Sequence, residues 1–172
     1  MKYTRIAQEL LRMRQDDQDM RKRDLRIKGS FDPEIDRLHT IRMKEIVESI
    51  GWPSISLVGA RASTAAWLLV QHADRSIRFQ QKCLRLMKQA RRGDIDRQLI
   101  AYLEDRICVN RGLPQMYGTQ FRQVRGSYVL WPLAKRSKID ALRASVGLGT
   151  LKEGVTQYHK KYRQFDHKRS AC

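Results

Sequence analysis

Apolar residues recur along much of the chain at intervals of three and four, the spacing that places side chains on one face of an α-helix. The first such stripe predicts a helix over residues 3–27, which Gly29 ends. Asp17 lies on this stripe and Arg21 follows it by one helical turn. We therefore expect both charges to point inward, either as an ion pair that fixes the helix or as part of a site.

Three further stripes predict helices that begin at a capping residue or after a glycine. Asp32 is a suitable N-cap and Pro33 suits the first turn, where its missing N–H costs little. The helices are expected over residues 33–49, 61–92 and 95–110. His72 falls on the apolar face of the longest stripe, between Gln71 and Asp74, where polar residues replace apolar ones for two turns. Such a face is typical either of a cavity wall or of a hydrogen-bonded core histidine.

Alternation with a period of two appears only in the second half of the chain. It predicts one strand over residues 115–124 and a partner over 127–131, joined by a turn. Residues 138–146 and 151–165 are expected to form the last helices. The expected fold is therefore mainly α, a single-domain bundle of about five to six helices over residues 1–165 with one small β-hairpin near 115–131. Residues 166–172 are expected to be a basic, frayed tail.

Composition agrees with one globular domain of 172 residues, 41% hydrophobic and 31% charged. No apolar run approaches the ~20 residues of a membrane-spanning helix, and the first residues lack a secretory pattern. We expect a cytoplasmic protein that does not enter a membrane. Its three cysteines, at 83, 108 and 172, are too few and too widely spaced for a disulfide framework or a zinc knuckle.

Charge is the strongest bulk property, because 35 Lys and Arg against 18 Asp and Glu give a net charge of +17. A chain this basic attracts phosphates, nucleic acids and acidic surfaces. The cations are spread over nearly every segment, however. A basic surface that only keeps the protein in solution therefore explains the charge as well as a polyanionic partner does. An anionic small molecule or a nucleic acid is thus an expected partner, while oligomeric state does not follow from the sequence.

Polar side chains gather in three segments that look like the lining of a cleft. They are residues 71–74, residues 105–106 near the end of a predicted helix, and residues 113–121. The turn at Gly93–Asp94 is short, so antiparallel helices on either side of it would return Asp105 towards His72.

Together these segments carry the side chains for acid–base chemistry, although none of their spacings is diagnostic. A histidine such as His72 can move a proton, an adjacent carboxylate can orient it, and an arginine can bind an anionic group. We expect His72, Asp105 and Tyr117 to be catalytic, with substrate bound by Arg21, Arg106, Gln115, Thr119 and Gln120. Phosphate-binding glycine loops and a His-Glu-x-x-His helix are missing, so no cofactor and no metal site is expected.

The segment Gln115-x-Tyr117-Gly118-Thr119-Gln120, with Gln71-His72-Ala73 and Gly51-Trp52-Pro53, resembles a family of small bacterial proteins of unassigned function. This likeness extends from about residue 8 to 152 and implies no activity. Three hypotheses remain open from the sequence. The chain is an enzyme acting on an anionic, phosphorylated or nucleic-acid substrate, a non-catalytic nucleic-acid-binding module, or an interaction protein whose polar cluster is structural.

Overall fold

The computed structural model describes residues 2–27, 29–125 and 127–166. Within them it contains eight helices and one antiparallel hairpin, which confirms the mainly α class with a small β-hairpin. The chain divides into two compact units, residues 1–100 and 101–172. The single domain expected over residues 1–165 stays a prediction. Of the basic tail expected at 166–172, Asp166 is the last residue of a helix, and residues 167–172 lie outside the described residues.

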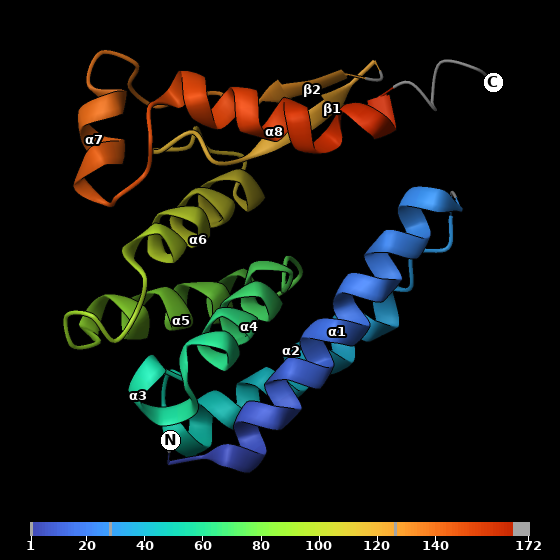
Figure 1. The fold of residues 1–172 in the computed structure, drawn as a ribbon, viewed down its shortest axis with the longest axis vertical. Helices are drawn as coiled ribbons and strands as arrows, with labels where there is room; N and C mark the ends of the chain where they lie inside the picture. The colour runs from blue at the N-terminus through green and yellow to red at the C-terminus, as the bar shows by residue number, and fades with distance from the viewer. Residues whose placement is uncertain (1, 28, 126, 167–172) are drawn as a thin grey trace. The chain divides into compact units, whose positions relative to one another are not determined.

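The first unit is built from helices packed around small and medium apolar side chains. They are α1 (Thr4–Arg26), α2 (Pro33–Ile50), α3 (Ile55–Val58), α4 (Ala60–Gln71) and α5 (Ile77–Gln89). Figure 1 shows α1 and α2 running antiparallel beside each other, with α4 against them. The buried face of α4 includes Ala62, Ala65 and Ala66, small side chains that let α1 approach closely.

Asp32 caps α2 as expected, because its carboxylate accepts a hydrogen bond from the amide of Glu34, and Pro33 is the first helical residue. The stretch after Trp52 forms the four-residue helix α3.

The single helix predicted over residues 61–92 is wrong, since the chain leaves helical geometry between His72 and Ser76. Gln80 gives the physical reason. Its side chain is fully buried, and its Nε2 donates to the carbonyls of Val70 at 3.1 Å and Gln71 at 3.4 Å. These bonds satisfy carbonyls at the end of α4 that a continuous helix would have paired with its own amides. The break places His72 at the C-cap of α4 rather than inside a helix.

The second unit contains most of α6 (Arg97–Asn110), which begins just before residue 101, then the hairpin and two helices. These are β1 (Phe121–Val124), β2 (Ser127–Leu130), α7 (Ile139–Ser145) and α8 (Leu151–Asp166). Phe121 pairs with Leu130 and Val124 with Ser127 in the antiparallel register.

Helix α8 begins with a capping box. The amide of Glu153 donates to the hydroxyl of Thr150, and the amide of Thr150 donates to the carboxylate of Glu153. Tyr158 then stacks on Phe121 with ring centroids 3.7 Å apart, so aromatic side chains join α8 to the hairpin. No helix in the described part of the chain has the length and apolar character needed to cross a membrane.

The strand predicted over residues 115–124 is wrong for its first six residues, because only Phe121–Val124 enters the ladder. Residues 115–120 form a compact loop in which Gln115 makes one isolated bridge, to Leu133. Side-chain hydrogen bonds fix this loop instead of a neighbouring strand, as the next subsection describes.

Candidate functional site

A histidine and a carboxylate meet in the first unit, where α1 passes the end of α4. His72 Nδ1 lies 2.7 Å from Asp17 Oδ1, although the residues are 55 positions apart. The Asp17 side chain is almost fully buried, at 1% exposure, while that of His72 keeps 18% of its surface exposed. One member of the pair is therefore enclosed by protein and the other reaches solvent.

Arg21 joins two carboxylates around this histidine. Its Nε lies 3.1 Å from Asp17 Oδ1 and 3.0 Å from His72 Nδ1. Its Nη2 donates to both carboxylate oxygens of Asp36 on α2, at 2.8 and 2.9 Å. We call Asp17, Arg21, Asp36 and His72 the His72 cluster. Two carboxylates, one guanidinium and one imidazole thus meet from three helices.

The hydrogen bonds decide which nitrogen of His72 carries its proton. Burial acts to raise the pKa of Asp17, but the hydrogen bond from His72 and the positive charge beside the carboxylate outweigh it and leave this pKa lowered. Asp17 is therefore ionised at neutral pH, and an ionised carboxylate only accepts hydrogen bonds. His72 Nδ1 is then the donor of the 2.7 Å contact, Arg21 Nε donates to Asp17 Oδ1 rather than to this nitrogen, and the lone pair of the neutral ring lies on Nε2.

Burial also shifts the pKa of Asp36, within the cluster, and that of His39, beside it. Desolvation raises the pKa of Asp36, although the charge of Arg21 and its hydrogen bonds oppose that rise. Burial lowers the pKa of His39, and the carboxylate of Asp17 is the leading charge that opposes the shift. The buried Nδ1 of His39 has no hydrogen-bond partner within the described residues. His39 is therefore held neutral beside a charged cluster.

In the second unit, the fully buried carboxylate of Asp105 organises the loop that carries the Tyr-Gly-Thr-Gln segment. It accepts from the backbone amides of Met116, Tyr117 and Thr119 at 2.7 to 2.9 Å and from the Thr119 hydroxyl at 2.9 Å. Burial raises the pKa of Asp105, and these four donors partly offset the effect. One carboxylate thus replaces the bonds that a β-strand would supply.

The two glutamines of the segment close the same network. Gln115 is fully buried, its Nε2 donates to the carbonyls of Gln120 and Trp131, and its Oε1 accepts from the amide of Gln120. Gln120 donates to the Thr119 hydroxyl, and its Oε1 lies 3.4 Å from Arg106 Nη1. We call Asp105, Gln115, Thr119 and Gln120 the Asp105 network.

Gly118 lies at the tightest point of the loop. Its φ is +70°, and a Cβ there would lie 2.6 Å from the side chain of Leu151. Arg143, 4% exposed, donates to the carbonyl of Tyr117 at 2.6 Å, and burial lowers its pKa. The positive φ of residue 118 therefore favours glycine, and a side chain there would also require Leu151 to move.

The structure gathers the residues expected in one cleft into two groups. Arg21 and His72 meet in the first unit, and Asp105, Arg106, Gln115, Tyr117, Thr119 and Gln120 lie together in the second. The expected inward ion pair of Asp17 and Arg21 is confirmed at 3.1 Å. Joining the two groups into one site, with Asp105 as partner of His72, stays a prediction.

Sequence reasoning placed Asp17 in the interior but did not assign it to the site, and it missed Asp36 altogether. Asp17 had a signal, since a charged residue on an apolar stripe needs a buried partner. Asp36 had none, because its position in the first turn of α2 is also where helices favour acidic residues.

Among the described residues, no group of three or more His, Cys, Asp and Glu side chains has the arrangement of a metal site. A family model matches the chain over residues 4–164, and that family is one of unknown function. No curated protein matches the chain, and no solved structure does.

Proposed function

Since the chain belongs to the family of unknown function DUF6624, we propose its activity from the His72 cluster: acid–base catalysis on an anionic, phosphorylated substrate. The 2.7 Å contact between His72 Nδ1 and Asp17 Oδ1 carries the proposal. A buried, ionised carboxylate that orients a partly exposed imidazole leaves Nε2 ready to accept and return a proton.

In the proposed reaction His72 Nε2 takes the proton from an attacking water or hydroxyl as a new P–O bond forms. The same nitrogen then returns a proton to the leaving oxygen as the old P–O bond breaks. Asp17 is a positioning residue that holds the ring and its tautomer and stabilises the transient imidazolium. Arg21 holds Asp17 and Asp36 in place, and its role as a substrate ligand stays a prediction.

In this proposal the residues of the second unit have roles that differ from those expected from the sequence. Asp17 takes the orienting role first expected of Asp105. The Asp105 network is proposed to support the Tyr117–Gln120 loop, since its donors and acceptors already bond to one another. Catalysis by Tyr117 and substrate binding by Arg106, Gln115, Thr119 and Gln120 stay predictions, as does the cytoplasmic location.

Replacing His72 by Gln tests the proposal. Purified wild-type protein and the variant are incubated with RNA and with a panel of phosphorylated metabolites, and phosphate-ester cleavage is measured. We expect kcat to fall by about a hundredfold or more, because the proton-transfer group is lost. Asp17→Asn should lower kcat with little change in KM, since the residue does not touch substrate.

His159→Gln is the matched control, because His159 is an exposed histidine on α8, outside the cluster. Its activity should equal that of the wild type. Unchanged turnover in His72→Gln would remove His72 from the mechanism. A wild-type protein that cleaves none of these compounds would contradict the assignment to phosphate esters.

A further inference from the structure

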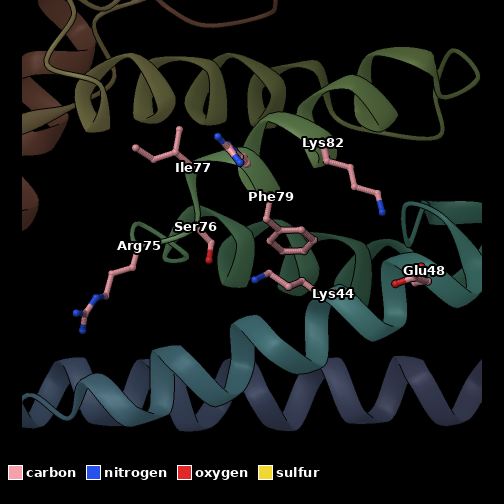
Figure 2. A pocket seen from close by; sticks show the side chains of 8 residues that line it. Lys44, Glu48, Arg75, Ser76, Ile77, Phe79 and Lys82 are labelled. Carbon is pink, nitrogen blue, oxygen red and sulfur yellow. The ribbon is translucent and has the colours of Figure 1, made fainter.

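A cavity of about 590 Å³ opens in the first unit between α2 and the start of α5 (Figure 2). Lys44 and Glu48 line it from α2, Arg75 and Ser76 from the connector that follows His72, and Lys82 from α5. Its volume lies in the ~300–1,000 Å³ range typical of small-molecule sites. The pocket is thus large enough for an organic ligand rather than a lone ion.

Positive charge dominates the lining. Four cations, Lys44, Arg75, Arg78 and Lys82, face one carboxylate, that of Glu48. All four cations are exposed, and none forms a salt bridge with any residue in the described ranges 2–27, 29–125 and 127–166. Unpaired cations around a concave surface attract an anionic ligand.

The start of α5 adds backbone donors to this charge. Ser76 is the N-cap of the 13-residue helix, but its side chain makes no capping hydrogen bond. Its carbonyl accepts from the amides of Phe79 and Gln80, which leaves those of Ile77 and Arg78 without a side-chain cap. Amides at a helix N-terminus, beside the positive end of its dipole, suit a phosphate group.

The floor of the pocket is apolar. Phe79 is 7% exposed, and its ring lies between the two helices in Figure 2, with Lys44 Nζ 5.8 Å from the ring centroid. Ile77 also lines the pocket and is partly exposed. These side chains offer a surface for the apolar or aromatic part of a ligand whose charge lies among the cations.

We infer that this pocket binds an organic phosphate about the size of a mononucleotide. Its phosphate lies at the start of α5 near Arg75 and Arg78, and its apolar part lies over Phe79 and Ile77. One part of the inference rests on the proposed function: this ligand is the substrate of His72, which precedes Arg75 by three positions in the sequence.

Binding of adenosine 5′-monophosphate, measured by isothermal titration calorimetry, tests the pocket. We expect the wild type to bind it more tightly than inorganic phosphate or adenosine alone. Arg78→Glu should weaken binding by about tenfold or more, because a charged hydrogen-bond donor becomes a repelling carboxylate. Arg85→Glu is the matched control, since it makes the same charge change on an exposed residue of α5 outside the pocket.

Three outcomes overturn the inference. They are no binding up to about 5 mM of the nucleotide, equal weakening by Arg78→Glu and Arg85→Glu, and equal affinity for the nucleotide and for either of its parts. His72→Gln should bind the nucleotide as the wild type does. Loss of turnover in this variant without loss of binding separates the proposed catalytic role from the pocket, and either can fail alone.

Discussion

At the scale of single residues, the environment of Asp17 determines its charge state and its contact with His72. It is almost completely enclosed, yet it stays ionised because His72, Arg21 and Gln18 all donate to it or attract it. A buried carboxylate of this kind can serve a reaction when one of its neighbours reaches solvent, and His72 does. The pair therefore combines a fixed charge with an accessible nitrogen.

The lowered pKa of Asp17 gives stability a defined pH dependence. The unfolded chain titrates this carboxyl near its ordinary value of 3.8, and the folded chain titrates it lower. Its stabilisation is therefore complete above 3.8 and is lost as pH falls through the folded pKa. We expect Asp17→Asn to lower the free energy of unfolding by about 1–3 kcal/mol at pH 7.

Urea unfolding of wild type and Asp17→Asn at a series of pH values measures this difference directly. The gap between the two should narrow as pH falls below 3.8, because protonated Asp17 loses its charge. Asp16→Asn, a neighbouring exposed position, controls for net charge. A gap that is constant from pH 7 down to pH 3 would show that the charge of Asp17 contributes nothing.

At the scale of elements, the loop at residues 115–120 depends on one carboxylate from α6. Asp105→Asn replaces an acceptor with an amide group that faces the backbone donors of Met116, Tyr117 and Thr119. We expect a loss of about 2–4 kcal/mol in the free energy of unfolding. Amide hydrogen exchange should accelerate in the loop, while Asp16→Asn should leave it unchanged. Unaltered exchange there would mean that the loop holds its shape without this carboxylate.

Sequence patterns predicted contacts within one helix but not contacts between helices. The Asp17–Arg21 pair could be predicted because both residues lie on one helix, four positions apart. The contact of Asp17 with His72 could not be predicted, because the two residues are 55 positions apart and belong to different helices. The helix break at residues 72–76 escaped prediction for a similar reason, since the bonds from Gln80 that favour it exist only after α5 has folded against α4.

The loop at residues 115–120 was predicted as a strand for a different reason. Its alternation of Tyr117, Thr119 and Phe121 is typical of a strand, and Phe121 does begin one. This alternation predicts that the backbone amides pair with a neighbouring strand, but the amide of Tyr117 donates to Asp105 instead. Gly118 also bends the chain, with a φ of +70°. The unusual density of polar residues was therefore the better guide, because those side chains hydrogen-bond one another within the fold.

At the scale of the whole molecule, the two units share the positive charge unequally. Residues 1–100 contain 21 Lys and Arg and 13 Asp and Glu, whereas residues 101–172 contain 14 and 5. The shorter segment thus has the higher excess charge per residue. This charge is spread along the chain and is not confined to the pocket. It should therefore favour binding of any polyanion, whatever the nucleotide sequence of that polyanion and without involvement of the pocket.

Binding of a 20-nucleotide single-stranded RNA separates this bulk attraction from the pocket. We expect its affinity to fall by at least about tenfold between ~50 and ~200 mM salt, because each neutralised phosphate releases counterions. Arg78→Glu and Arg85→Glu should weaken RNA binding equally, although only the first should weaken binding of the mononucleotide. An RNA affinity that hardly changes with salt would rule out charge as its source and would require a specific site for the polymer.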